Sequence, residues 1–243
     1  MKNIIFHVPH DGNELVDELM EAILVSKDTF LFHHNKMRDT GASLFAPFYP
    51  NSQVLKFNIS RLLCDVERFI GENEIMEQYG MGFCYEKSFD GTVIKNISSE
   101  IKEKTRQLYE EHHKRLDDLV KEAKFPVIIV DLHSFSQDII VHQTLSEPLP
   151  DICIGYDSYL SEKCAEKMRN IFEKNGFSVA LNYPYEGSMV PDCIFYKEFE
   201  CECSSFMIEV NKSCYIKNGI LNEDIINLIQ SSIREILDFL NEN

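Results

Sequence analysis

The chain has 243 residues, of which 44% are hydrophobic and 26% charged, and its formal net charge is −16. This acidic balance argues against nucleic acid and anionic membranes as partners, because the phosphate backbone is bound by clustered Lys and Arg. The sequence lacks an apolar run of the ~20 residues that span a bilayer, and it does not begin with the features of a signal peptide. We therefore expect a globular protein of the cytoplasm.

The eight cysteines do not follow the spacing of a small secreted disulfide scaffold. We expect them to be reduced and mostly buried, as free cysteines commonly are. Cys201 and Cys203 form a Cys-Glu-Cys unit that is compatible with metal binding, but alternation along a strand explains the same spacing.

In chain order, short apolar runs predict buried strands over residues 3–8, 126–132, 151–155, 177–181 and 205–210. Apolar residues at helical spacing predict helices over residues 14–26, 98–123, 158–175 and 222–240, with Ser158 and Asn222 as N-caps. Residues 79–97, which contain Asp90-Gly91, predict a small β-hairpin. Strands that alternate with helices predict one α/β domain over residues 1–243, with a mixed, mostly parallel sheet and helices on both faces.

Histidines follow two of the predicted strands. His10 comes just after the first strand and His133 ends the strand of residues 126–132, whereas His7 lies inside its strand and is expected to be packed. Ligands bind beyond the carboxyl ends of strands in such sheets, and imidazole nitrogen is a preferred ligand of Zn²⁺. Asp131 is a candidate to orient one of these rings.

A catalytic zinc site usually has three protein ligands, so two histidines need a carboxylate beside them. Glu14 and Asp39 are the two candidates. Each also has a structural interpretation: Glu14 suits the first turn of a helix, and Asp39 suits a turn or cap.

Three further side chains suggest catalysis and substrate binding. Glu209 lies in a predicted buried strand, where a carboxylate must be paired, protonated or functional, and beside a metal it can act as a general base. Arg61 and Arg68 suit a substrate carboxylate, and the alternative is a structural ion pair with Asp65. The loop of residues 182–187 offers Asn and Tyr side chains to a substrate.

Two pairs of adjacent histidines are interpreted differently. His112 and His113 lie on a predicted helix and are expected to be a surface pair, with one of them reaching the site as the alternative. His33 and His34 diverge if they lie on a helix, so they are not expected to bind one ion.

Taken together, the sequence resembles the N-formylglutamate amidohydrolase family. The residues that carry the resemblance occur in family order: Pro9-His10-Asp11-Gly12, Asp39, Ser60-Arg61, Asp65, Arg68-Phe69, Tyr109, His113, Asp131-Leu132-His133-Ser134, Asn182, Pro184-Tyr185, Gly187, Glu209 and Tyr215. That family looks like a relative of the zinc carboxypeptidases and aspartoacylases, which implies a zinc-exopeptidase-like fold of the phosphorylase/hydrolase-like kind. In the segment similar to aspartoacylases, Arg68 occupies the place of the substrate-binding arginine, and Glu67 stands where asparagine is expected.

The resemblance implies a zinc-dependent amidohydrolase. It implies that His10, Asp39 and His133 bind Zn²⁺ or another divalent metal, with Glu14 as the alternate third ligand, and that Glu209 is the general base. Arg61, Arg68, Asn182 and Tyr185 are the expected substrate-binding residues. The expected substrate is a small N-acyl amino acid, first N-formyl-L-glutamate, which gives formate and L-glutamate. The alternatives are a related N-acyl amino acid deacylase, a carboxypeptidase-like peptidase, or a non-catalytic binding protein on the same fold. The sequence leaves the oligomeric state open.

Overall fold

The computed structural model describes residues 1–71, 74–123, 126–140, 145, 147–198 and 202–242. Its strands are β1 (Asn3–Val8), β2 (Ser52–Lys56), β3 (Val127–Phe135), β4 (Ile152–Gly155), β5 (Val179–Leu181), β6 (Cys203–Asn211), β7 (Ile216–Lys217) and β8 (Ile220–Leu221). Its α-helices are α1 (Asp17–Met20), α2 (Lys27–Met37), α3 (Ser99–Glu122), α4 (Glu162–Lys174), α5 (Asp192–Phe195), α6 (Lys212–Tyr215) and α7 (Glu223–Glu242). Short 3-10 turns are η1 (Ala42–Phe45), η2 (Glu77–Tyr79) and η3 (Gln137–Ile139).

The main sheet has six strands in the order β2-β1-β3-β6-β4-β5. All neighbours pair in parallel except β4 and β6, which are antiparallel. The predicted mixed, mostly parallel sheet is therefore confirmed, and all five predicted strands belong to it. The sequence did not predict the edge strand β2, because its side chains are half-exposed and show no apolar run.

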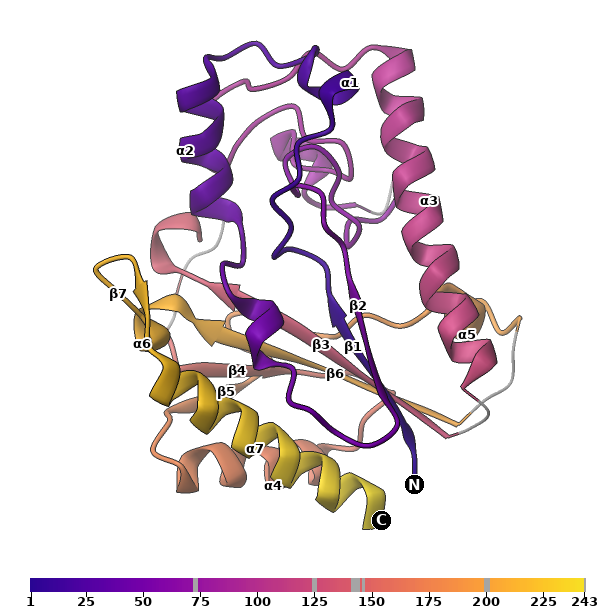
Figure 1. Cartoon of the computed structure of the whole chain (residues 1–243), viewed down its shortest axis with the longest axis vertical. Coiled ribbons are helices and arrows are strands. Elements are labelled where there is room, and N and C mark those ends of the chain that lie inside the picture. The colour runs from indigo at the N-terminus through magenta and orange to yellow at the C-terminus, as the bar shows by residue number, and fades with distance from the viewer. Residues whose placement is uncertain (72–73, 124–125, 141–144, 146, 199–201, 243) are drawn as a thin grey trace.

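Helices cover both faces of this sheet, as predicted (Figure 1). Alternation along the strands divides the core in two. Ile4 of β1 packs in the cluster that includes α4 and α7, whereas Ile5 packs in the cluster that includes α3. A third apolar cluster, which includes α2 and the segments around Leu62 and Tyr85, lies beyond the strand ends and forms the upper part of the molecule in Figure 1.

Three predicted helices are confirmed as α3, α4 and α7. Asn222 caps α7 by accepting from the backbone N–H groups of Asp224 and Ile225, but α4 is capped by Ser161 rather than Ser158. The predicted helix of residues 14–26 is wrong apart from the single turn of α1. Backbone groups at both ends of this segment pair with other segments, at residues 58–60 and 94–96, and these bonds replace the intrahelical ones.

Residues 79–97 form the predicted turn without a ladder. Gly91 adopts φ 85°, the backbone N–H of Ser88 donates to Thr92 and that of Ile94 donates to Glu86, but the two arms form one isolated bridge, between Lys87 and Val93, rather than a strand ladder. None of the described helices is long and apolar enough to cross a membrane. The structure shows no disulfide bond between any two of the described cysteines, and Cys201 lies outside the described residues.

Candidate active site

The strand register brings the predicted polar residues together on one face of the sheet. In the parallel pairing, His7 stands opposite Asp131 and His133 stands opposite Glu209. These four side chains alternate with residues of the α4 and α7 core, so they point to the opposite face, which α3 covers. They therefore lie at the carboxyl ends of three adjacent strands.

His10 reaches the same place from the turn after β1. The chain can turn here because Gly12 has no side chain: a Cβ at this position would lie 2.4 Å from the carbonyl oxygen of Ile59. The backbone N–H of Asp39 donates to the carbonyl of His10 at 3.0 Å, which holds the two segments together. Arg38 and the backbone of Gly41 donate to Asp11, which fixes the turn further.

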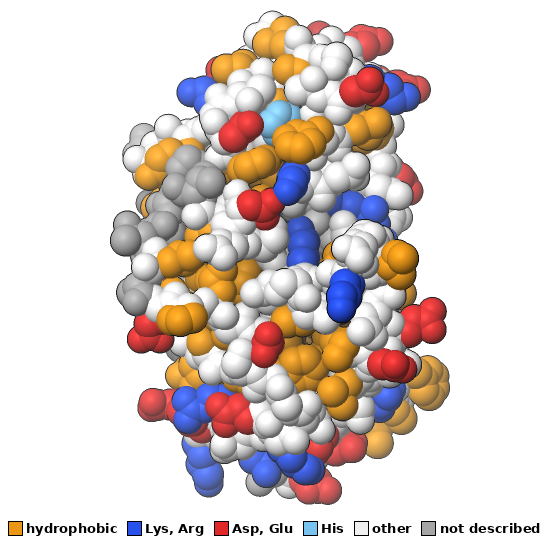
Figure 2. All heavy atoms as spheres, turned by 90° about the vertical axis from the view of Figure 1, so that its left-hand side faces the viewer, with side chains coloured by type: hydrophobic (Ala, Val, Ile, Leu, Met, Phe, Trp, Pro, Cys, Tyr) orange, Lys and Arg blue, Asp and Glu red, His pale blue; other side chains and the backbone are white. Residues whose placement is uncertain are grey.

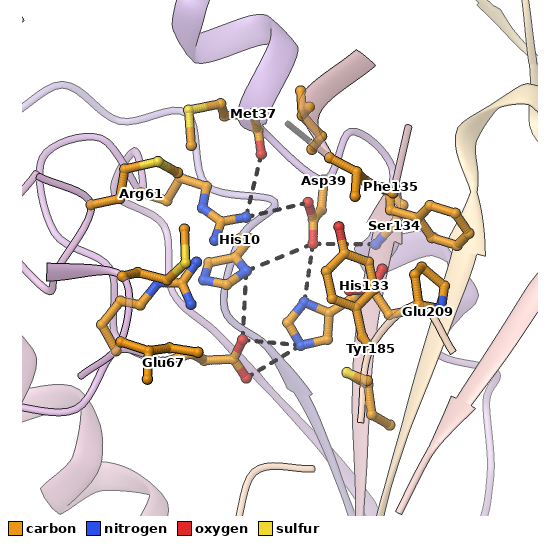
Figure 3. Close-up of a pocket in the computed structure, with 18 of the residues that line it drawn as sticks. His10, Met37, Asp39, Arg61, Glu67, His133, Ser134, Phe135, Tyr185 and Glu209 are labelled. Carbon is orange, nitrogen blue, oxygen red and sulfur yellow. Dashed lines mark hydrogen bonds and ion pairs between the residues drawn. The ribbon is translucent and has the colours of Figure 1, made fainter. Parts of the chain in front are cut away.

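The two histidines meet between two carboxylates (Figure 3). The ring centroids of His10 and His133 are 5.1 Å apart. Asp39 Oδ2 lies 3.1 Å from His133 Nδ1 and 3.7 Å from His10 Nδ1. Glu67 Oε2 lies 3.2 Å from His133 Nε2 and 3.6 Å from His10 Nδ1. The predicted trio of His10, Asp39 and His133 thus converges, and Glu67 joins it as a residue that the sequence did not single out as a metal ligand.

Asp65 supports the site from behind His10. Its Oδ1 lies 2.8 Å from His10 Nε2 and accepts from the backbone N–H of Glu67 at 3.1 Å. Its Oδ2 accepts from Arg61 Nε and Nη2, at 3.2 and 2.8 Å, and from the Tyr85 hydroxyl at 3.0 Å. The side chain of Asp65 is completely buried, so these bonds fix its position and that of the His10 ring.

The cluster has the donors and spacing of a cation site. One ligand atom from each of His10, Glu67 and His133 lies within 4.8 Å of the others, and the buried His10 Nδ1 makes no hydrogen bond. Ligands at the usual ~2.0–2.1 Å around a tetrahedral zinc are about 3.3 Å apart, which is close to the separations found here. His7, Glu67 and Asp131 form a second, overlapping group.

The charges within the cluster also favour a cation. Burial lowers the pKa of His133, but Glu67 and Asp131 outweigh burial and hold it well above the usual range. Burial and Arg61 lower the pKa of His10, yet Asp65 and Asp39 make the net shift upward. The negative charge of the carboxylates thus favours the protonated form of both imidazoles. A bound cation would be stabilised by the same negative charge.

Glu209 lies beside this cluster with a free carboxylate oxygen. The residue is 7% exposed, and its Oε2 makes no hydrogen bond in the described structure. Burial raises the pKa of Glu209 to about 8, and although the charge on His133 opposes this shift, Asp39 and Glu67 add to it. Such a carboxyl is suited to accept and return a proton near neutral pH.

The remaining predicted residues have different surroundings. Arg61 makes the structural ion pair with Asp65 that was the alternative interpretation, and Arg68 Nε is 3.7 Å from the same carboxylate. Asn182 and Tyr185, the other two expected substrate-binding residues, line the pocket. Glu14 is exposed and does not line the pocket, so the structure gives no support to its role as alternate ligand.

The expectation that His112 and His113 lie at the surface is wrong, since they are 6% and 7% exposed. His112 Nε2 lies 2.8 Å from His7 Nε2, and His7 Nδ1 lies 2.8 Å from Asp131 Oδ1. Asp131 Oδ1 is in turn 3.2 Å from His133 Nε2, so the predicted orienting role of Asp131 has a geometric basis. His113 instead contacts the carbonyl of Val66.

His33 and His34 diverge on α2, as predicted. His34 Nδ1 is bonded to the Ser60 hydroxyl at 2.8 Å, whereas the ring of His33 packs against that of Phe89.

The cluster lines one pocket of about 560 Å³. Its described lining combines the catalytic candidates with both arginines and with a set of apolar side chains: Met37, Ile75, Met76, Met81, Phe135, Ile139, Ile140 and Met207. A pocket of this size and mixed chemistry is typical of a site for a small organic molecule.

Comparison with known proteins bears on the fold and the family of the chain. Solved structures with the same fold include an N-formylglutamate amidohydrolase from Ralstonia eutropha JMP134, with a TM-score of 0.80 and 18% identity over 99% of this chain and 94% of that one. They also include a gene product from Agrobacterium tumefaciens, with a TM-score of 0.70 and 18% identity over 99% of this chain and 92% of that one. A search of curated proteins finds no match. Among family models, that of N-formylglutamate amidohydrolase matches residues 2–216. The chain therefore belongs to the N-formylglutamate amidohydrolase family.

Proposed function

We propose that the protein is a metal-dependent amidohydrolase that cleaves the amide bond of an N-acyl amino acid, the reaction for which its family is named on N-formyl-L-glutamate. The observation that carries the proposal is the convergence of His10 and His133 on Glu67, with an unpartnered imidazole nitrogen directed into the pocket. The free carboxyl of Glu209 in the same pocket favours catalysis over a purely binding role.

We assign the metal to His10, His133 and Glu67. Asp39 Oδ2 also accepts from the backbone N–H of Ser134, so it is positioned to hold His133 through Nδ1 while Nε2 faces Glu67. Asp65 Oδ1 is likewise positioned to hold the His10 ring, through Nε2. A carboxylate behind each imidazole is the usual support of a metal-binding histidine. Two imidazoles and one carboxylate favour zinc among the divalent ions.

A divalent ion bound here would polarise the substrate carbonyl and lower the pKa of water toward ~7. Glu209 accepts a proton from the attacking water and returns it to the leaving nitrogen. Burial keeps this carboxyl out of bulk water, so the proton remains within the site until the amine leaves.

Substrate orientation comes from the side chains around this centre. Arg68 is the better placed arginine for the substrate carboxylate, because Arg61 is already bonded to Asp65. Asn182 adopts φ 52° and its side chain accepts from the backbone N–H of Tyr156, which fixes the loop that carries Tyr185 into the pocket. Holding the amide against the base in this way supplies the proximity contribution to catalysis.

The proposal is tested by hydrolysis of N-formyl amino acids, with N-formyl-L-glutamate as the reference, followed as release of formate. We expect activity in the zinc-loaded protein, its loss on treatment with a chelator, and its return on addition of zinc. Full activity in protein shown by elemental analysis to be metal-free would exclude the mechanism.

A further inference from the structure

A chain of buried polar side chains runs from α3 to the metal site, and the proposed mechanism makes no use of its far end. We infer that His7 and His112 are positioning residues for the metal, an assignment that rests on the proposed function. They hold the carboxylate of Asp131, which in turn keeps the His133 ring in the position that binds the ion. Neither His7 nor His112 is among the residues that carry the family resemblance.

Three contacts make up this chain of side chains. His112 Nε2 lies 2.8 Å from His7 Nε2, and His7 Nδ1 lies 2.8 Å from Asp131 Oδ1. The same Asp131 oxygen is 3.2 Å from His133 Nε2. That nitrogen also faces Glu67, whose Oε2 lies 3.2 Å away. The chain of side chains therefore ends at the atom of His133 that we assign to the metal.

These side chains are enclosed by the protein. His7 is completely buried, and Asp131 and His112 are 2% and 6% exposed. α3 lies on the right in Figure 1, and the face of the molecule away from it, shown in Figure 2, has histidine surface in a small area near its top. Burial of two imidazoles and a carboxylate is unfavourable unless each of them is hydrogen-bonded. Each contact therefore constrains the position of the next side chain.

The direction of each hydrogen bond follows from the carboxylate. Ionised Asp131 only accepts, so His7 donates to it through Nδ1. In neutral His7 the other nitrogen, Nε2, then has no proton, and His112 donates to it through its own Nε2. His112 thus selects the tautomer of His7 that donates to Asp131. Without His112, the proton of His7 could equally lie on Nε2, and Asp131 would lose its hydrogen bond.

The hydrogen bond from His7 keeps Asp131 from moving closer to His133. Asp131 Oδ2 accepts from the backbone N–H of Met189 at 3.1 Å, so Met189 and His7 hold the carboxylate at both oxygens. At 3.2 Å from His133 Nε2, Oδ1 is near the spacing of about 3.3 Å between two ligands of a tetrahedral zinc. A carboxylate freed from His7 would approach to the ~2.7–2.9 Å of a charge-assisted hydrogen bond and compete with the metal for that nitrogen.

The other nitrogen of the His133 ring is held separately. Asp39 Oδ2 accepts from His133 Nδ1 at 3.1 Å, which leaves Nε2 of the neutral ring without a proton. Asp39 therefore fixes the orientation of the ring. The bond from His7 to Asp131 decides whether the lone pair on Nε2 is available to an ion.

Contacts of α3 fix the position of His112. Its ring packs edge to face against that of Phe57, with centroids 5.1 Å apart. The next residue, His113, lies 2.7 Å from the carbonyl oxygen of Val66. Leu116, one turn further along the same buried face, packs in the apolar cluster beneath the helix. The imidazole of His112 thus reaches His7 from a helix that is anchored on both sides of it.

Two amide substitutions of His112 test the role of this residue. The side-chain nitrogen of glutamine reaches about as far as imidazole Nε2, whereas that of asparagine reaches about as far as Nδ1. We expect His112→Gln to retain zinc affinity within about threefold of the wild type, and His112→Asn to lose about 10- to 100-fold, measured by competition with a chromophoric chelator. Equal zinc affinities of the two variants would overturn the inference.

Leu116→Ala is the control for lost packing. It removes apolar contacts one turn along the same face of α3 without removing a hydrogen bond. We expect it to lower Tm at least as much as His112→Asn does and to leave zinc affinity unchanged. A loss of zinc affinity equal to that of His112→Asn would show that the packing of α3, and not the hydrogen bond, determines zinc binding, and would overturn the inference.

A matched pair at His7 provides a second test, which also decides the matter if a variant of His112 does not fold. Here the amide nitrogen must stand at the place of Nδ1, facing Asp131, so asparagine is the conservative replacement. We expect His7→Asn to bind zinc about tenfold more tightly than His7→Gln. A general effect of substitution would not produce opposite preferences at positions 7 and 112. Equal affinities, or the reverse order, would contradict the inference.

Activity separates this inference from the proposed function. At saturating zinc we expect His112→Asn to keep the KM of the wild type for N-formyl-L-glutamate within about twofold, since His112 is not among the residues that line the described pocket. A wild type that neither binds zinc nor hydrolyses an N-formyl amino acid would remove the proposed function, and the inference with it. A zinc-dependent wild type whose two His112 variants bind zinc alike would remove the inference alone.

Discussion

Asp65 Oδ1 lies 2.8 Å from His10 Nε2, and this contact orients the ring so that its other nitrogen faces the pocket. Arg61 and Tyr85 hold the second oxygen of the same carboxylate. One buried aspartate thus links an arginine predicted to bind substrate to a histidine predicted to bind metal. The position of His10 therefore depends on residues that need not touch either ligand.

Asp65→Asn should weaken zinc binding. An asparagine accepts hydrogen bonds at one end of its side chain and donates at the other, so it cannot hold both the His10 ring and Arg61 as the carboxylate does. We expect zinc affinity to fall about 10- to 100-fold, measured by competition with a chromophoric chelator. Tyr85→Phe removes one bond to the same carboxylate and serves as the milder comparison. Unchanged affinity in folded Asp65→Asn would show that Asp65 does not position His10.

Substitution of single carboxylates should distinguish ligands from supporting residues. We expect Glu67→Gln to reduce zinc affinity by more than about a hundredfold, since it removes a ligand. Asp39→Asn should reduce it about 10- to 100-fold, because Asp39 acts through His133. Glu14→Gln is the control and should bind zinc as the wild type does, since Glu14 is exposed outside the pocket. A larger loss of zinc affinity in Asp39→Asn than in Glu67→Gln would show that Asp39, and not Glu67, is the third ligand.

Glu209→Gln should lower turnover without altering metal binding. The amide keeps the size of the side chain but cannot accept the proton, so kcat should fall by about 10²–10⁴-fold. Zinc affinity should stay within about twofold, because Glu209 is outside the ligand group. Glu223→Gln on the exposed start of α7 is the matched control. Normal turnover in Glu209→Gln would exclude this residue as the base.

His34 should make the fold less stable in acid. Burial, aided by the charge of Arg38, lowers its pKa from 6.5 to about 4. Between these two values the unfolded chain binds a proton that the native state does not. The stability that His34 provides is therefore complete above about pH 6.5 and is lost as the pH falls toward about 4, by up to about 1.4 kcal/mol per pH unit.

Urea unfolding between pH 7 and 4.5 measures this dependence. His34→Gln replaces the ring by an amide that can still reach Ser60 and cannot titrate, so its free energy of unfolding should fall less steeply with acid than that of the wild type. Asn35→Gln changes an exposed neighbour on α2 and should parallel the wild type. If all three curves run parallel, His34 is not held neutral by the fold.

The regular part of the fold and three of the site residues could be predicted from sequence. Buried strands leave apolar runs, and His10, His133 and Glu209 each lie at or near the end of such a run. Because parallel strands end at one edge of the sheet, their convergence followed from topology alone. The prediction of a helix over residues 14–26 was wrong because backbone pairing with distant segments, such as the bridge between Glu14 and Ile59, replaces local helical bonds.

Glu67 lies in an irregular segment, where periodicity gives no guide. Val66 is completely buried between Asp65 and Glu67, but the chain turns at residues 66 and 67, so no regular pattern placed Glu67 in the site. His112 and His113 did carry a signal, since they share the buried face of α3 with Thr105, Leu116 and Val120. The ion pair of Arg61 with Asp65, in contrast, depends on side-chain geometry that the sequence does not encode locally.

The metal assignment is tested most directly by a crystal structure of the zinc-soaked protein, with anomalous scattering recorded on both sides of the zinc absorption edge. We predict one strong zinc peak within bonding distance of His10 Nδ1, His133 and a Glu67 oxygen. A peak bonded to other residues, or none in active crystals, would contradict it.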